Sequence, residues 1–415
     1  MNYRQELIEL AVGARSAARV LATVSTETKN MAIAAIAQAL EENQQQILAA
    51  NAKDIAAGEA KGLTKALIDR LLLTPDRISD IAQAAREVIE LPDPIGSVIR
   101  GSKRPNGLQV NQVRVPLGVI GMIYEARPNV TVDAAILAIK SGNACLLKGG
   151  SEAFETNLVL SQLIQAAIAP YIPQTAVNFI AYTDRAVVTA LIQLHGYLDV
   201  VVPRGSQRLI SAVVENATVP TIETGIGICH TYVDASADLT MALAIVENAK
   251  VQRPAVCNSL ETILVHEAIA SQFLPQLLAR FTTLGVEIRG CERTQAMIPV
   301  VPATAKDWDT EYLDLIVSVK IVADINGAIE HIFQHGSKHS EAIITNDFAN
   351  SQQFLAEVDA AAVYVNASTR FTDGGALGYG AELGISTQKL HARGPLGLSE
   401  LTTNKYQIIG TGQVR

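Results

Sequence analysis

Apolar side chains recur at helical spacing through residues 3–90 of the chain. The segment "MAIAAIAQALEENQQQILAAN" (31–51) has the periodicity of an amphipathic helix. The segment "TPDRISDIAQAAREVIEL" (74–91) begins with Thr74 and Pro75, a typical N-cap residue followed by a proline in the first turn. We therefore expect the first part of the chain to be helical.

The pattern changes at residue 96. The stretch "GSVIRGSKRPNGLQVNQVRVP" (96–116) has two strand-like halves around Pro105, Asn106 and Gly107, which predicts a β-hairpin. Short apolar runs then alternate with longer helical stretches. The expected strands of this first series are 118–124, 144–149, 176–182 and 198–205, and the expected helices are 131–142, 155–169, 186–194 and 206–216.

A second alternating series follows residue 257. Its expected strands are 261–266, 315–322, 341–347 and 361–366, and its expected helices are 269–281, 325–336 and 351–358. Strands that alternate with helices in this way form βαβ units and parallel sheets. The sequence therefore predicts an α/β protein with two doubly wound lobes, into which the 96–116 hairpin is inserted.

Length and composition narrow the class of protein. A chain of 415 residues is long enough for two or three domains. A net charge of −8 argues against a nucleic-acid partner, because phosphate binding requires clustered Lys and Arg. No uncharged apolar run reaches about 18 residues, and the charged start "MNYRQELIEL" lacks a signal-peptide core, so we expect neither a membrane segment nor secretion.

The four cysteines are far apart in the sequence and include no C-x-x-C pair. We therefore expect no cysteine-based metal or redox motif, but reduced thiols in a cytoplasmic protein. Cys145 lies in the apolar run "ACLLK" and fits a buried position, whereas Cys229 and Cys291 have no obvious activator. Cys257 differs, because "VQRPAVCNSLE" (251–261) places it between turn-forming residues ahead of a strand. It is either an exposed nucleophile or, like most lone cysteines, a small buried residue.

Two turns are candidates for binding a nucleotide. The chain has neither the G-x-G-x-x-G nor the P-loop motif. However, "LLKGGSE" (146–152) and "VVPRGSQRLI" (201–210) each place glycine and serine between a strand and a helix, where free N–H groups favour an anion. The alternative is that both segments are ordinary strand-to-helix turns, in which glycine is common.

Four long segments carry a resemblance to a known family. They are "YEARPNVTVDAAILAIKSGNACLLKGGSE", "LDVVVPRGS", "VQRPAVCNSLETILVH" and "AAVYVNASTRFTDGGALGYGAELGISTQKLHARGPLGL". Together they resemble the γ-glutamyl phosphate reductases, a phosphate-releasing branch of the aldehyde dehydrogenase superfamily, and the resemblance extends over essentially the whole chain. It implies NADPH-dependent reduction of L-glutamyl 5-phosphate to L-glutamate 5-semialdehyde, the second step of proline biosynthesis.

The resemblance also implies a domain plan. A cofactor domain would span 1–230, a catalytic domain 231–390, and a C-terminal segment 391–415 would complete the cofactor side. The 96–116 hairpin and the strand at 403–412 would form an oligomerisation arm, so we expect a homo-oligomer; the alternative is two flexible appendages. A transient contact with glutamate 5-kinase stays open, although no tail or charged patch in the sequence indicates one.

The resemblance assigns the reacting groups. Cys257 would displace phosphate to form a thioester, which hydride transfer from NADPH converts to the aldehyde. Asn129 would donate an N–H to the developing oxyanion, together with the backbone of the cysteine; the alternative is a turn asparagine that bonds to its own backbone. Arg127 and Arg393 would bind the anionic groups of the substrate, or else serve as structural ion-pair partners.

The same resemblance assigns the cofactor contacts. Lys148 would meet the adenosine ribose and, with Ser151, the 2′-phosphate that distinguishes NADPH from NADH. Gly205 and Ser206 would form the turn beneath the dinucleotide. Glu311 would bind the nicotinamide ribose. The alternatives are a solvated strand-end lysine for Lys148 and a surface carboxylate for Glu311.

Two further features test the assignment. Glu223 lies before Cys257 at a spacing similar to that of the water-activating glutamate in hydrolytic aldehyde dehydrogenases, but we expect it to be a bystander. A hydrolytic NAD-dependent enzyme is therefore one rival function, and a catalytically silent interaction protein on the same fold is another.

His331, His335 and His339 have the spacing of a metal motif, but Gly336 and Ser337 interrupt it, so we expect a helix end and then a strand near residue 341.

Overall fold

The computed structural model describes residues 3–415, so residues 1–2 of the predicted first domain lie outside the described residues. The chain divides into two compact units. Unit 1 consists of Met1–Thr224, Gly378–Gly384 and Leu396–Arg415, and unit 2 consists of Gly225–Leu377 and Ile385–Pro395. The expected boundary near residue 230 falls within the first strand of unit 2.

The N-terminal part of unit 1 is helical, as predicted. Its helices are α1 (Tyr3–Leu21), α2 (Thr26–Glu42), α3 (Gln44–Ala60), α4 (Lys65–Leu71) and α5 (Pro75–Glu90). Thr74 caps α5, because its side chain accepts a hydrogen bond from the backbone N–H of Arg77 while Pro75 occupies the first turn. Ile33, Ile36 and Leu40 of α2 are buried, so this helix presents its apolar face to the body of the unit.

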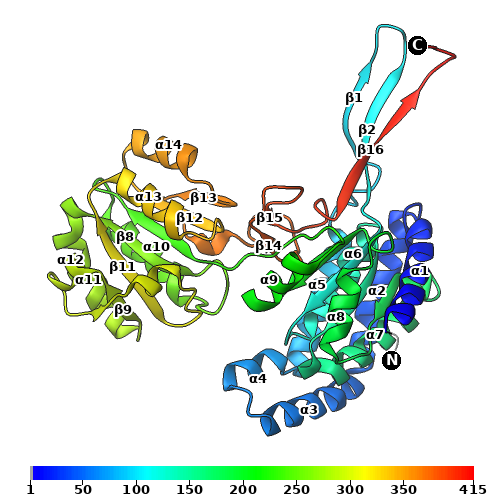
Figure 1. Cartoon of the computed structure of the whole chain (residues 1–415), viewed down its shortest axis with the longest axis horizontal. Helices are drawn as coiled ribbons and strands as arrows, with labels where there is room; N and C mark the ends of the chain where they lie inside the picture. The colour runs from blue at the N-terminus through cyan, green and yellow to red at the C-terminus, as the bar shows by residue number, and fades with distance from the viewer. Residues whose placement is uncertain (1–2) are drawn as a thin grey trace. The chain divides into compact units, whose positions relative to one another are not determined.

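A parallel sheet of four strands forms the centre of unit 1 (Figure 1). The strand order is β5-β4-β3-β6, and the strands are β3 (Val119–Tyr124), β4 (Ala144–Gly149), β5 (Val177–Phe179) and β6 (Val200–Arg204). The helices that follow them are α6 (Asn129–Lys140), α7 (Phe154–Ile168), α8 (Arg185–Ile192) and α9 (Gln207–Asn216). Every residue of β3 and β4 is buried, which explains why both strands consist mostly of apolar residues, with Lys148 of β4 as the exception.

Unit 2 contains a parallel sheet of seven strands in the order β10-β9-β11-β8-β7-β12-β13. The strands are β7 (Cys229–Val233), β8 (Leu260–His266), β9 (Glu287–Gly290), β10 (Val301–Pro302), β11 (Ile316–Val322), β12 (Ser340–Ile344) and β13 (Ala362–Val365). The helices are α10 (Leu239–Val251), α11 (Glu267–Thr283), α12 (Glu292–Gln295), α13 (Ile325–His335) and α14 (Phe348–Glu357). The two predicted lobes are thereby confirmed.

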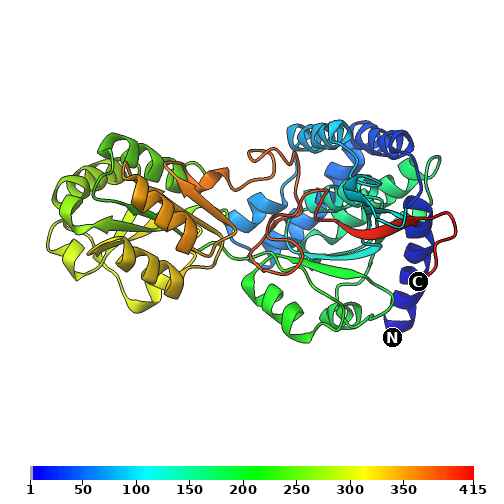
Figure 2. The ribbon, with the colours of Figure 1, turned by 90° about the horizontal axis from the view of Figure 1, so that it is seen from above.

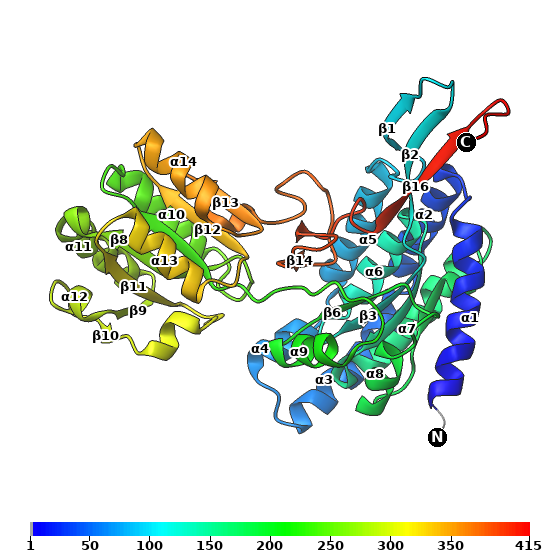
Figure 3. The same cartoon turned by 45° about the horizontal axis from the view of Figure 1, so that its top comes forward.

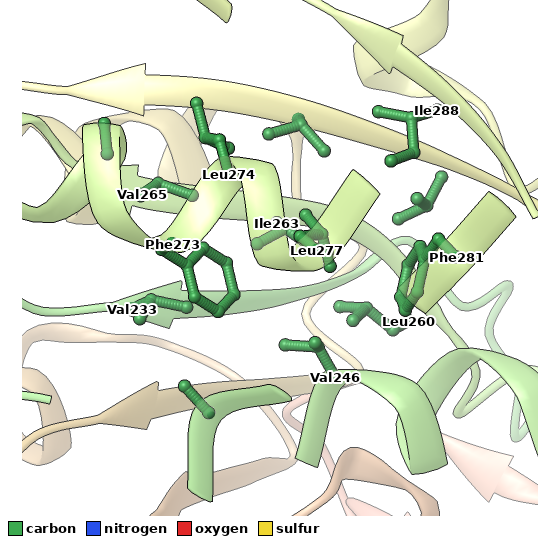
Figure 4. Close-up of a cluster of buried hydrophobic side chains, with 14 of the residues drawn as sticks. Val233, Val246, Leu260, Ile263, Val265, Phe273, Leu274, Leu277, Phe281 and Ile288 are labelled. Carbon is green, nitrogen blue, oxygen red and sulfur yellow. The ribbon is translucent and has the colours of Figure 1, made fainter. Parts of the chain in front are cut away.

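Helices cover both faces of this sheet (Figure 2). On one face, Phe273, Leu277 and Phe281 of α11 pack against Leu260 and Ile263 of β8 (Figure 4). The opposite face buries a second cluster, formed by Tyr232, Leu264, Ile332, Ile343 and Phe354. Burying such a side chain contributes roughly 1.5–3 kcal/mol, so the two clusters hold the strands of unit 2 in place.

Three antiparallel strands of unit 1 form a separate ribbon (Figure 3). They are β1 (Val98–Lys103), β2 (Gln109–Pro116) and β16 (Thr402–Ile409), in the order β1-β2-β16. The predicted hairpin is confirmed, and the C-terminal strand pairs with β2 from Thr402 opposite Pro116 to Ile409 opposite Gln109. We call these three strands the arm. A small pair, β14 (Ile385–Ser386) and β15 (Gly394–Pro395), completes the sheets of the described residues.

Candidate active site

Most of the residues that the sequence assigned to cofactor or oxyanion binding in unit 1 meet at one edge of its sheet. Tyr124, the last residue of β3, pairs with Gly149 of β4 and with Arg204 of β6, so the three strands end side by side. The segments that follow these ends carry Arg127, Asn129, Ser151, Gly205 and Ser206, while Lys148 lies one residue before the end of β4. The carboxyl edge of a parallel sheet is where such folds place their ligands.

Asn129 is the first residue of α6 and is half-buried. Its side-chain amide donates a hydrogen bond of 2.8 Å to Asp133 Oδ2. Burial raises the pKa of Asp133 to about 6, although the Asn129 hydrogen bond and the charge of Arg204 act in the opposite direction. Asp133 was not among the predicted site residues; the available signal was its position four residues after Asn129, although the predicted helix began only at residue 131.

The loop between β3 and α6 contains a strained residue. Ala126 has φ of 44°, which is in the left-handed region that alanine rarely adopts. Its backbone N–H donates a hydrogen bond of 2.7 Å to Glu152 Oε1, and this contact helps to hold the strained conformation. Arg127, the predicted substrate-binding arginine, follows directly and is half-buried. Backbone strain of this kind often marks a functional loop.

Lys148 is buried in this structure rather than solvated. Its side chain is only 5% exposed, and Nζ donates a hydrogen bond of 2.7 Å to the carbonyl oxygen of Gly149. Burial lowers the pKa of Lys148, while the charge of Glu152 acts in the opposite direction. Ser151, which begins the short helix η1 (Ser151–Ala153), is exposed.

The turn at Gly205 and Ser206 binds a carboxylate. Ser206 caps α9, and its backbone N–H and hydroxyl donate hydrogen bonds of 2.7 and 3.2 Å to the carboxylate of Glu125. A β-carbon at position 205 would lie 2.5 Å from Glu125 Oε2, so the glycine permits this approach. Glu125 was not among the residues predicted from the sequence. The contact shows that the turn offers N–H and O–H donors to an anionic group.

Cys257 lies in the turn between α10 and β8 of unit 2 and is half-buried. Cys145 is buried, as predicted, and Cys229 is buried too, whereas Cys291 is half-buried like Cys257. Burial raises the pKa of Cys291, but hydrogen bonds from Thr294 and from backbone N–H groups outweigh this effect and leave it below the usual value. Any chemical labelling of Cys257 must therefore separate it from Cys291.

Glu311 connects to the turn that carries Cys257. Its Oε1 atom accepts a hydrogen bond of 2.8 Å from the backbone N–H of Gly227. Gly227 in turn lies against Cys257, since a β-carbon on residue 227 would be only 1.4 Å from the Cys257 carbonyl oxygen. Glu311 is therefore half-buried and bound within unit 2, not a solvated surface carboxylate.

Arg393 forms an ion pair with Asp359, with 2.7 Å between Nη1 and Oδ1. The same carboxylate is 2.9 Å from Lys389 Nζ, and hydrogen bonds from Lys389 and Arg393 lower the pKa of Asp359 to about 2. The Nε and Nη2 atoms of Arg393 are buried and have no hydrogen-bond partner within residues 3–415. Arg393 thus combines a structural ion pair with donors that remain available.

The three histidines of the H-x-x-x-H-x-x-x-H pattern have different partners. His331 Nδ1 lies 3.0 Å from Lys320 Nζ, and burial lowers the pKa of His331 to about 2. His335 Nδ1 lies 2.8 Å from Asp309 Oδ1, and His339 Nδ1 lies 2.8 Å from Ser340 Oγ. Helix α13 ends at His335 and β12 begins at Ser340, as predicted. Within residues 3–415, no group of three or more His, Cys, Asp or Glu side chains could hold a metal ion.

The model of the aldehyde dehydrogenase family matches residues 2–321. The chain belongs to this family. Membership makes it an oxidoreductase and indicates a nicotinamide cofactor. No helix within residues 3–415 is long and apolar enough to cross a membrane.

Relatives of this family member confirm the resemblance to γ-glutamyl phosphate reductases. The enzyme of that name from Moorella thermoacetica is 59% identical over 417 residues, covering 100% of both chains. A crystal structure of γ-glutamyl phosphate reductase from Thermotoga maritima has a TM-score of 0.97 and 51% identity, and covers 99% of this chain and 100% of that one. An acetylating aldehyde dehydrogenase from Geobacillus thermoglucosidasius, at 17% identity and a TM-score of 0.71 over 100% of this chain and 98% of that one, shares the fold.

Proposed function

We propose that this chain reduces L-glutamyl 5-phosphate to L-glutamate 5-semialdehyde with NADPH and releases phosphate, as the second step of proline biosynthesis from glutamate. The main support is the 59% identity, over the full length of both chains, to a relative named γ-glutamyl phosphate reductase. A half-buried cysteine in a turn at the amino end of a central strand supplies the nucleophile that this reaction requires.

The proposed reaction runs through a thioester on Cys257. The thiolate attacks the acyl carbon, the carbon–sulfur bond forms, and phosphate leaves with the electrons of the carbon–oxygen bond. NADPH supplies the hydride that reduces the thioester carbon. The resulting hemithioacetal collapses to the aldehyde and returns the thiolate. Both stages develop an oxyanion, for which Asn129 and the backbone N–H of Cys257 are the proposed donors.

The carboxyl edge of the sheet in unit 1 suits a phosphorylated dinucleotide. Its turn at Gly205 and Ser206 offers an N–H and a hydroxyl that bind the carboxylate of Glu125 in this structure. Lys148 and the exposed Ser151 are the proposed ligands of the 2′-phosphate, which favours NADPH over NADH. Glu311 is the proposed ligand of the nicotinamide ribose.

The substrate carries several anionic groups, and forked guanidinium groups bind such groups well. Arg127 and Arg393 are the proposed ligands. For Arg393 the support is specific, because two of its nitrogen atoms are buried without a hydrogen-bond partner within residues 3–415 while a third pairs with Asp359. A buried donor without a partner is costly, and a substrate carboxylate or phosphate would relieve that cost.

The test is the reverse reaction, measured with the semialdehyde, NADP and phosphate, with each component omitted in turn. We expect NADPH formation only when all three are present. Cys257→Ala should abolish turnover and leave NADPH binding and thermal stability close to those of the wild type, while Cys291→Ala should retain activity. Comparable turnover in Cys257→Ala would exclude the thioester mechanism.

We propose that the enzyme works in a reducing cytoplasm and forms a homo-oligomer. The four cysteines are free thiols in this structure, which fits a reducing cytoplasm. The arm presents exposed apolar side chains, among them Val98 and Ile408, which fits pairing with a second copy of the chain. We also propose a transient contact with glutamate 5-kinase, which is tested by measuring transfer of the labile acyl phosphate between the two enzymes.

A further inference from the structure

Residues 227–229 lie directly behind the turn that carries Cys257, and we call them the support segment. Gly227 makes the closest approach. A β-carbon on Gly227 would be 1.4 Å from the carbonyl oxygen of Cys257 and 2.7 Å from its α-carbon. Real β-carbons do not approach other atoms so closely, so any other residue at position 227 would displace the backbone of the cysteine.

The support segment is itself held in place by side chains from two other parts of unit 2. The Gly227 N–H donates to Glu311 Oε1 at 2.8 Å, and the Ile228 N–H donates to Ser337 Oγ at 2.8 Å. Cys229 then begins β7, a strand in the middle of the sheet. The segment is buried throughout, so it forms a firm surface for the turn to rest on.

Cys229 makes the direct polar contact with the turn. Its thiol is fully buried and donates a hydrogen bond of 3.2 Å to the carbonyl oxygen of Cys257. Burial, reinforced by the charges of Glu341 and other nearby acidic groups, raises the pKa of Cys229 well above its usual value. The sulfur therefore keeps its proton and acts as a hydrogen-bond donor, not as a second nucleophile.

We infer that Cys229 is a positioning residue for the nucleophile. Its S–H group holds the carbonyl of Cys257, and Gly227 lets the two backbones come close enough for this contact. Together they fix the rotation of the Cys257 backbone and hence the direction in which the reactive thiol projects. Because a small misplacement of a reacting group lowers the rate strongly, this contact affects the chemical step. The inference rests on the proposed role of Cys257.

The first experiment compares Cys229→Ala, which removes the donor, with Cys229→Ser, which keeps one. For the phosphate-dependent oxidation of the semialdehyde, we expect Cys229→Ala to lower kcat about three- to tenfold, with little change in the KM for NADP. This decrease corresponds to the free energy that one hydrogen bond contributes. Cys229→Ser should recover most of that loss. Cys145→Ala, which truncates a buried cysteine of β4 in unit 1, is the matched control and should retain wild-type kcat.

A second readout needs no substrate. The rate at which iodoacetamide labels Cys257 is measured by peptide mass spectrometry, which resolves it from the half-buried Cys291. We expect Cys229→Ala to change the labelling rate of Cys257 and to leave that of Cys291 unchanged. If wild-type Cys257 is not labelled and Cys257→Ala stays active, the proposed function fails. If Cys257 is labelled normally and Cys229→Ala matches the wild type in both kcat and labelling, only the present inference fails.

A third variant tests the close approach. Gly227→Ala should lower kcat about a hundredfold or more, because its β-carbon must push the Cys257 carbonyl away. Gly327→Ala is the matched control, since its β-carbon would meet atoms no closer than 3.6 Å, and it should be fully active. Full activity of Gly227→Ala would overturn the inference, and if this variant does not fold, the Cys229 series decides.

Discussion

The side-chain amide of Asn129 donates a 2.8 Å hydrogen bond to Asp133 Oδ2, one turn further along α6. An amide that uses one of its two N–H bonds in this way has a defined orientation, so the other N–H can be directed at a ligand. Burial raises the pKa of Asp133 to about 6, which places the titration of this contact close to neutral pH. The proposed oxyanion donor is therefore oriented by a group whose charge depends on pH.

The pH dependence of activity tests this relationship. Above pH 6 the Asp133 carboxylate accepts a charge-assisted hydrogen bond from Asn129, and below pH 6 protonation weakens that bond. We expect the kcat of the phosphate-dependent reaction to fall as the pH decreases through about 6. Asp133→Asn should remove this step from the profile. A step that persists unchanged in Asp133→Asn belongs to another group.

The raised pKa of Asp133 also predicts how the stability of the fold depends on pH. The folded pKa of about 6 lies above the ordinary value of 3.8, so the folded state binds this proton more tightly than the unfolded state. The contribution of Asp133 to stability is therefore highest at low pH and decreases as the pH rises from about 4 to about 6. Asp133→Asn should raise the melting temperature, relative to the wild type, more at pH 8 than at pH 4, as followed by circular dichroism.

Substitution of Lys148 tests whether this residue makes the enzyme prefer NADPH over NADH. Lys148→Met keeps the buried apolar stem of the side chain and removes the charge, so it should raise the KM for NADPH about ten- to a hundredfold and that for NADH much less. Lys148→Ala also loses the packing of the stem and serves as the comparison. Equal losses with both cofactors in Lys148→Met would assign the lysine to its contact with the Gly149 carbonyl instead.

Glu223 separates the proposed reaction from that of the hydrolytic aldehyde dehydrogenases. If it activates no water, Glu223→Gln should keep phosphate-dependent oxidation of the semialdehyde within about a few-fold of the wild type, because a general base contributes about a hundred- to ten-thousandfold. Wild-type enzyme without phosphate should be nearly inactive. Free turnover without phosphate, abolished by Glu223→Gln, would instead identify an acid-forming dehydrogenase.

Substitutions in the arm test the prediction that the chain forms a homo-oligomer. Ile408 of β16 is 61% exposed, and its exposed side chain is expected to be covered by a second copy of the chain. Ile408→Asp should therefore lower the molecular mass measured by analytical ultracentrifugation. Asn404→Asp adds the same charge to an exposed polar position of the same strand, and it should leave the mass unchanged. An unchanged mass in both variants would remove Ile408 from the interface.

Several of the buried strands were predictable from the sequence. β3, β4 and β8 consist mostly of apolar residues, since each lies within a parallel sheet covered by helices. β7 was not predicted as a strand, although its five residues are all buried. β7 contains His230, whose backbone N–H and Nδ1 are both within 3.0 Å of Glu341 Oε2. A polar residue whose partner is more than a hundred positions away gives no local sign that it is buried.

The site was predictable to a similar extent. For the candidate site of unit 1, the sequence by itself determined where the strands end and the helices follow, and it placed Cys257 of unit 2 in a turn, because these features depend on neighbouring residues. It did not show Glu125 on the turn at Ser206, nor Gly227 and Cys229 behind Cys257. These contacts join residues far apart in the chain, so only tertiary packing decided them. The family pattern therefore supplies the proposed reacting groups, while the fold decides which side chains contact them.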